Sequence, residues 1–311
     1  MGNDYIDQLK AFIKQEYLLD LRTITPAKRG YYGETWKIET VEGSYFVKLD
    51  YLARHQKLFE NSLPVVDYLC SSGLDFIPKV IKTRTGEFHS IFNNAVLAVF
   101  EWLDGENIET NESKTFEYQL LNKLYRLTKP GFKLPVAVFS NDSEMRFYEN
   151  WHLLNELSPT SDTKIVQSLL EGRRAQLEES AARLLHFATI CGNNQNDFYL
   201  THGDAGGNFF VSDGKHYLVD WDEVMYAPLE REAWVMGIHE WAQKLFNDTL
   251  QENGIKYRLC QNRLAFYCYH MFFHYLNEFM IDFMTHGNSE RIEQYFNDGW
   301  IEQYIEFADG I

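Results

Sequence analysis

The segment THGDAGGNFFVSDGKHYLVDWD, from Thr201 to Asp222, concentrates side chains that could do chemistry. The polar residues at its two ends are His202, Asp204, Asn208, Asp220 and Asp222. Phosphoryl transfer from a nucleotide needs such a set, because a carboxylate must orient the attacking hydroxyl and accept its proton, and hard oxygen ligands must hold Mg²⁺. The segment is therefore either an ordinary surface hairpin or a phosphoryl-transfer centre.

The same segment predicts how these groups meet. Hydrophobic triplets at 209–211 and 217–219 flank a turn that contains Asp213-Gly214, which is typical of a β-hairpin. The two outer ends of a hairpin lie side by side. Acid and amide groups far apart in the sequence should then gather at one edge of a two-stranded ribbon.

The rest of the chain predicts the elements that must position this edge. The first hundred residues predict a small, mostly antiparallel sheet with strands over 21–25, 35–40, 44–49, 79–83 and 95–100. A helix over 51–69 contains Pro64, which should kink or split it. Later helices are predicted over 113–127, 144–157, 165–188, 229–246, 258–285 and 290–307. The chain is thus an α+β protein with a small sheet lobe, residues 1–103, and a large helical lobe, residues 104–311.

The motifs His202-Gly203-Asp204, Asn208 and Asp220-Trp221-Asp222 resemble those of the aminoglycoside phosphotransferase and choline kinase superfamily. Its members are small-molecule kinases with a bilobal, protein-kinase-like fold. The resemblance covers nearly the whole chain, because the two lobes also come in the expected order. It implies that Asp204 is the catalytic base, that Asn208 and Asp220 bind Mg²⁺, and that His202 braces the catalytic loop.

The resemblance also assigns the nucleotide site. Lys48, in the strand SYFVKLD, resembles the lysine that binds the phosphates, although a solvated strand lysine would look the same. Its expected ionic partner is Glu60 in the following helix, with Asp50 as a rival.

Two further segments resemble parts of that nucleotide site. The loop RGYYGET places Gly30 and Gly33 where phosphates would be covered, or it is an ordinary hairpin turn. The segment AVFEWLDGEN resembles the hinge that holds adenine by backbone groups, between Glu101 and Leu103.

The sequence departs from the family pattern in two places. Asn208 follows Asp204 by four residues, where the family usually has five, and only flexible backbone at Gly206 and Gly207 could restore its reach. Gly203 stands where protein kinases carry an arginine that senses a phosphorylated activation loop. That substitution is normal in this superfamily and implies an enzyme that is not switched in that way.

Candidate acceptor residues follow the hairpin. The stretch APLERE resembles one found in part of the superfamily, including spectinomycin-type phosphotransferases. The acceptor candidates are Asp222, Glu230, Glu232 and Trp241. Acids at a helix start equally suit the helix dipole, and Trp241 lies on a helix face typical of a core. Aromatic residues over 267–275 are either core or the wall of a pocket for a quaternary ammonium group.

Composition restricts the partners. The formal net charge of −16 argues against nucleic acid, and it suits either a cationic small molecule or simple solubility. The first seventeen residues predict an amphipathic helix rather than a signal peptide, and no apolar run approaches the roughly 18 residues of a membrane span. A cytoplasmic protein is expected, and the oligomeric state is left open.

Three functions fit these features. The first is a kinase that uses ATP or GTP with Mg²⁺ and phosphorylates a hydroxyl of an amino sugar or aminocyclitol antibiotic. The second is a metabolite kinase of the choline, homoserine or fructosamine type. The third is a nucleotide-binding module without catalysis, which the retained base, lysine and metal ligands disfavour.

Overall fold

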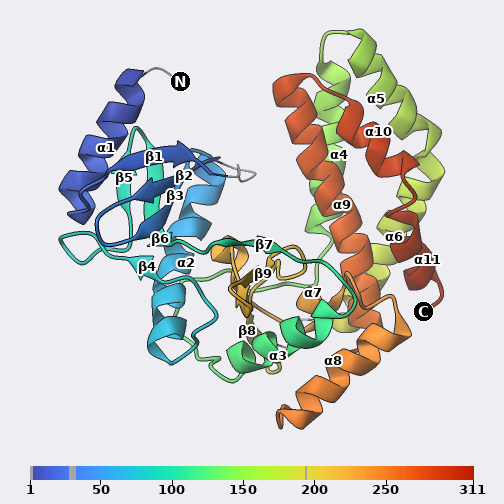
Figure 1. The fold of residues 1–311 in the computed structure, drawn as a ribbon. Coiled ribbons are helices and arrows are strands. Elements are labelled where there is room, and N and C mark those ends of the chain that lie inside the picture. The colour runs from blue at the N-terminus through green and yellow to red at the C-terminus, as the bar shows by residue number, and fades with distance from the viewer. Residues whose placement is uncertain (1–2, 28–32, 193–194) are drawn as a thin grey trace. The chain divides into compact units, whose positions relative to one another are not determined.

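A computed structural model describes residues 3–27, 33–192 and 195–311, which form two compact units (Figure 1). Unit 1 joins Met1–Val136 with Tyr199–Ala227, and unit 2 joins Ala137–Phe198 with Pro228–Ile311. The expected boundary after Leu103 falls inside unit 1. The reason is that β7 (Gly105–Asn107) pairs with β9 (Phe209–Ser212), so the hairpin and the segment after Leu103 belong to the same unit.

Unit 1 is built on the predicted antiparallel sheet. Its strands are β1 (Thr23–Pro26), β2 (Gly33–Glu39), β3 (Ser44–Asp50), β4 (Val80–Ile81), β5 (Ser90–Phe92) and β6 (Ala95–Glu101). The strand order is β1-β2-β3-β6-β4, with β5 also paired to β6. In this register Lys48 lies opposite Thr35 on one side and opposite Ala98 on the other.

One face of this sheet packs in a hydrophobic core, and the other face carries Lys48. Val47 and Leu49 are fully buried in a core that includes Leu9 and Ile13 of α1 (Asn3–Tyr17). Because neighbouring strand residues point to opposite faces, Lys48 lies on the other face, where α2 (Ala53–Ser71) packs. Figure 1 shows α1 and α2 on opposite sides of the sheet. The alternation therefore directs the lysine away from the core.

Helix α2 corrects one expectation, because it is not split at Pro64. The helix continues from Ala53 to Ser71, and the neighbouring Leu63 and Val65 are fully buried. Packing of this apolar face outweighs the one hydrogen bond that proline cannot donate.

The remaining parts of unit 1 complete it around the hairpin. They are α3 (Ser113–Tyr125), β8 (Tyr199–Thr201), β10 (Lys215–Leu218), the 3₁₀ turn η1 (Trp221–Glu223) and β11 (Met225–Ala227). The strands form two small sheets, β10-β9-β7 and β11-β8. The first of these carries the segment singled out above.

Unit 2 is helical. It contains α4 (Asp142–Glu156), α5 (Ser161–Gly172), α6 (Arg174–Cys191), α7 (Glu230–Ala233), α8 (Glu240–Glu252), α9 (Gln261–His286), α10 (Glu290–Asn297) and α11 (Glu302–Asp309). Three helices expected to be continuous, over 165–188, 229–246 and 290–307, are each divided in two. None of the helices in the described part of the chain has the length and apolarity that a bilayer crossing requires.

Helix α9 is the centre of this unit. It packs against α4, α6, α7, α10 and α11. Its aromatic side chains Tyr269, Phe272 and Phe273 are fully buried, and Tyr267 is nearly so. They form the core rather than an open aromatic box for a quaternary ammonium group.

A histidine of α9 makes unit 2 sensitive to acid. Burial, together with the charges of His274, Arg231 and Arg146, lowers the pKa of His270 from 6.5 to about 3. Below about pH 6.5 the imidazole of His270 is protonated in the unfolded chain but stays neutral in the folded chain. The free energy of unfolding therefore falls as the pH drops. Between about pH 6.5 and pH 5 we expect a loss of about 2 kcal/mol.

Urea unfolding of the wild type and of His270→Phe at both pH values measures this contribution. The variant should lose about 2 kcal/mol less than the wild type over the same interval. An equal loss in both proteins would show that His270 is not the responsible group.

Candidate active site

The hairpin forms as predicted. Ser212 pairs with Lys215 and Phe209 with Leu218, which leaves a two-residue turn. Both turn residues have positive φ, 47° at Asp213 and 73° at Gly214, the backbone that such tight hairpins require. The N–H of Val219 donates to the carbonyl of Asn208 at 3.0 Å, so the two outer ends do lie together.

His202 connects the loop at residues 202–208 to the far end of the hairpin. It is fully buried and packs on Trp221, with ring centroids 4.5 Å apart. Its Nδ1 accepts from the N–H of Asp204 at 3.3 Å, and its Nε2 donates to the carbonyl of Val219 at 3.0 Å. Because a carbonyl can only accept, these contacts require the neutral tautomer protonated at Nε2. The histidine braces the loop.

The short spacing between Asp204 and Asn208 is accommodated by a tight turn. The N–H of Asn208 donates to the carbonyl of Ala205 at 3.0 Å, and its Nδ2 donates to the carbonyl and Oδ2 of Asp204 at 2.7 and 3.2 Å. Neither Gly206 nor Gly207 has a positive φ, so unusual glycine backbone is not what closes the loop. With Nδ2 directed at Asp204, Oδ1 of Asn208 is left for a ligand.

Lys48 reaches the hairpin end. Its Nζ donates to Oδ1 of Asp220 at 2.8 Å and to Oδ2 of Asp222 at 2.5 Å, and it lies 5.4 Å from the ring centre of Phe59 in α2. Asp222 is buried beside the lysine and lines the same cavity, and its predicted contact with an acceptor stays a prediction.

The expected partners of Lys48 are engaged elsewhere. Glu60 is 2.8 Å from Nζ of Lys57 and 3.8 Å from Nε2 of His89. Asp50 accepts from the N–H of Leu52 at 2.8 Å and is hydrogen-bonded to Nδ1 of His55. The helix phase turns Glu60 away from Lys48, and the strand end turns Asp50 into the cap of α2. Neither prediction of a Lys48 partner holds.

The pKa values of Asp220 and Asp222 are shifted in opposite directions. Burial and the charge of Asp220 raise the pKa of Asp222 to about 6, although Lys48 and His55 oppose the shift. Although desolvation opposes it, the charge and the hydrogen bond of Lys48, with the charge of His55, lower the pKa of Asp220. Although burial opposes it, hydrogen bonds to Asp50 and Glu223 raise the pKa of His55 to about 9. His55, a residue that the sequence motifs did not indicate, lies beside Asp50 and Asp222.

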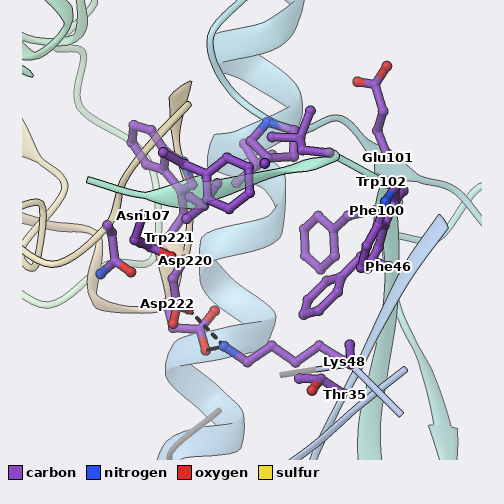
Figure 2. Close-up of a pocket in the computed structure, with 18 of the residues that line it drawn as sticks. Thr35, Phe46, Lys48, Phe100, Glu101, Trp102, Asn107, Asp220, Trp221 and Asp222 are labelled. Carbon is purple, nitrogen blue, oxygen red and sulfur yellow. Dashed lines mark hydrogen bonds and ion pairs between the residues drawn. The ribbon is translucent and has the colours of Figure 1, made fainter. Parts of the chain in front are cut away.

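These groups surround a cavity of about 680 Å³ that lies wholly within unit 1. Its lining includes Thr35, Phe46, Lys48, Phe100, Glu101, Trp102, Leu103, Asn107, Asn208, Asp220, Trp221 and Asp222. Figure 2 shows the rings of Phe46, Phe100 and Trp102 gathered on one wall, with Lys48 extended toward Asp220 and Asp222. Such a volume and lining are typical of a small-molecule site. The predicted hinge residues Glu101 and Leu103 lie at its edge.

The aromatic wall was not predicted, yet the sequence held a signal for it. Phe46 is two residues before Lys48 and so shares its face of the strand, and Phe100 lies opposite Phe46 in the next strand.

Of the two glycines predicted to cover phosphates, Gly30 lies outside the described residues. Gly33 begins β2, where a Cβ would lie 1.8 Å from the carbonyl oxygen of Leu49. Close strand pairing therefore explains Gly33.

The donor atoms present suit Mg²⁺. Asn208 offers a neutral amide oxygen and Asp220 a carboxylate, and both line the cavity next to Lys48. Mg²⁺ is usually held by one or two carboxylates together with phosphate oxygens and water. These two residues would hold it.

The acceptor candidates of unit 2 are dispersed. Glu230 is fully buried, and its carboxylate accepts from the Tyr257 hydroxyl at 2.5 Å and from the N–H of Cys260 at 2.6 Å. It is an internal anchor and not a contact for a substrate. Glu232 is half-buried on the same short helix, and Trp241 is 40% exposed and stacks on His239. The sequence could not distinguish buried from exposed acids in APLERE.

The glycine of the His-Gly-Asp motif has a steric role. Gly203 has a φ of 87°, and a Cβ there would lie 2.2 Å from the carbonyl oxygen of Glu223. Gly203→Ala should therefore destabilise the protein by about 1–3 kcal/mol or shift the loop at residues 202–208. Thermal unfolding measures the loss, and Gly206→Ala, where a Cβ meets nothing within 4 Å, is the control. Equal stability of the two variants would contradict the steric account.

Known proteins resemble this chain in sequence pattern and in fold. A family model described as the phosphotransferase enzyme family, abbreviated APH, matches residues 23–263. No curated protein sequence matches.

Three similar solved structures illustrate the fold. The crystal structure of spectinomycin phosphotransferase APH(9)-Ia with ADP and spectinomycin has a TM-score of 0.77 at 18% identity, with 97% of both chains covered. Amicoumacin kinase hAmiN, in complex with AMP-PNP, Ca²⁺ and Ami, gives 0.62 at 13% identity, covering 99% of this chain and 94% of that one. Macrolide 2′-phosphotransferase MphH from Brachybacterium faecium gives 0.57 at 12% identity, covering 93% and 96%. All three share the protein-kinase-like α+β fold expected from the sequence.

Proposed function

Because this chain belongs to the phosphotransferase enzyme family, we propose that it is a small-molecule kinase that transfers the γ-phosphoryl group of ATP or GTP to an alcohol. The observation that carries the proposal is the convergence of Lys48, Asn208 and Asp220 on one cavity beside the Asp204 loop. The nucleotides named with similar structures, ADP and AMP-PNP, support nucleotide use.

Each group has a task in this reaction. The aromatic wall of Phe46, Phe100 and Trp102 holds the flat base, and Lys48 holds the phosphates. Mg²⁺, when bound by Asn208 and Asp220, would neutralise charge on the phosphate oxygens.

Asp204 completes the mechanism as the base. It is exposed, so an acceptor can reach it. It orients the acceptor hydroxyl and takes its proton while the hydroxyl oxygen bonds to the γ-phosphorus and the β–γ bridging bond breaks, which releases the nucleoside diphosphate.

For the acceptor, we propose an amino sugar or aminocyclitol. The net charge of −16 would attract a cationic acceptor, and spectinomycin is named with the similar phosphotransferase APH(9)-Ia. The aromatic residues of α9 are buried in the core, so they give no support to choline as an acceptor.

The test is release of ADP or GDP from the magnesium nucleotide in the presence of a panel of acceptors. The panel holds aminoglycosides, spectinomycin, choline and homoserine, with a hydroxyl-free amine as the control. Turnover with an amino sugar or aminocyclitol supports the proposal. Turnover with choline or homoserine only would identify a metabolite kinase, and nucleotide binding without turnover would identify a binding module.

A further inference from the structure

Two donors from outside the catalytic loop contact its carbonyls. Nδ2 of Asn107, at the end of β7, donates to the carbonyl of Gly207 at 2.8 Å. Nζ of Lys114, in the first turn of α3, lies 3.5 Å from the carbonyl oxygen of Gly206 and donates to Oε2 of Glu117 at 2.6 Å. Both residues lie about ninety positions or more before the loop, so a separate segment holds it.

The pair of Lys114 and Glu117 is buried, which is unusual for a lysine. The two residues are 6% and 3% exposed. Removing both charges from water costs several kcal/mol, and their attraction often does no more than offset it. Burial raises the pKa of Glu117 to about 7, although Lys114 opposes the shift. Stabilisation of the fold therefore does not explain why this ion pair is buried. The contact between Lys114 and the carbonyl of Gly206 points to a different role.

The loop between Asp204 and Asn208 depends on contacts from outside it. Its turn leaves the carbonyls of Gly206 and Gly207 without partners inside the loop, while Asn208 directs its own N–H and Nδ2 at Ala205 and Asp204. A Cβ at Gly207 would lie 3.3 Å from Oε1 of Glu109, so the neighbouring segment also packs closely there. Only three residues separate Asp204 from Asn208, so movement of either carbonyl would also move Asn208.

We propose that Lys114 and Asn107 are positioning residues for phosphoryl transfer: they hold the carbonyls of Gly206 and Gly207 and thereby fix Asn208 against Asp204 and beside Asp220. This inference rests on the proposed function, because it assigns a role within the same site. Lys114 does not itself touch the cavity, so its effect passes through the loop.

The main test is the double variant Lys114→Met/Glu117→Leu, which removes the tether without leaving a lone buried charge. We expect kcat to fall about 10- to 100-fold while the KM for the nucleotide stays within about twofold. Hydrogen exchange of the amides over residues 204–208 should become about tenfold faster. The matched control is Lys123→Met, an exposed lysine of the same helix, which should change neither quantity.

A second variant keeps the proposal falsifiable if the double variant does not fold. Asn107→Ala removes the other donor at an exposed position and disturbs no buried charge, and it should also speed exchange over 204–208. Unchanged exchange in these variants, or faster exchange with an unchanged kcat, would overturn the proposal.

The measurements separate failure of the kinase proposal from failure of the proposed positioning role. A wild type without turnover on any acceptor would overturn the kinase assignment and the catalytic part of this inference together. The exchange measurement would still show whether the tether exists.

Discussion

Asp204→Asn should lower kcat by about 10²- to 10⁴-fold, the range that loss of a positioned general base produces. The variant keeps the size of the side chain and an oxygen that can accept from Nδ2 of Asn208, so the loop should keep its shape. Because Asp204 is exposed, the melting temperature should stay within experimental error. Initial rates at saturating nucleotide, with the acceptor identified by the panel, give kcat directly.

The matched control for this prediction is Asp213→Asn. Asp213 is an exposed aspartate of the same hairpin, and asparagine tolerates its φ of 47°. The control should keep full turnover. Full turnover in Asp204→Asn as well would remove Asp204 from the mechanism and leave the reaction without an assigned base.

Glu230→Ala should lower the free energy of unfolding by about 3–5 kcal/mol, because it removes a buried, hydrogen-bonded carboxylate and leaves its donors unpaired. Tyr257 and the N–H of Cys260 both donate to this carboxylate, and Arg263 lies 3.9 Å from it. Urea unfolding of the whole chain, followed by far-UV circular dichroism, measures the loss.

Glu240→Ala is the control for Glu230→Ala, since Glu240 is an exposed acid that begins α8. It should change stability by less than about 0.5 kcal/mol. If Glu230→Ala instead raised the KM for the acceptor and left stability unchanged, the structural role would be wrong and the acceptor role suggested by APLERE would be right.

What the sequence predicted well depends on local rules. The pattern of residues 44–49 predicted the strand that carries Lys48, and the Asp213-Gly214 turn predicted the hairpin that joins Asn208 to Val219. Both features follow from residues within a few positions of each other. Neither needs knowledge of distant parts of the chain.

What the sequence missed depends on distant contacts. The partner of Lys48 is set by the phase of α2 and by a residue more than 170 positions away, and neither can be read from periodicity. The segments 165–188 and 290–307 carry continuous apolar patterns, yet the structure divides each of them into two helices. Glu230 looked like a surface acid at a helix start, and only the fold shows that it is buried.

Unit 1 is assembled from two stretches of chain that are synthesised at different times. The ribosome releases β1 to β7 about a hundred residues before β9, the strand that β7 pairs with. At about 5–20 residues per second, the sheet can form several seconds before Asp220 and Asp222 exist to meet Lys48. The nascent chain therefore carries Lys48 and the aromatic wall of the cavity during that interval, and the cavity gains Asp220 and Asp222 only after the first helices of unit 2 have been made.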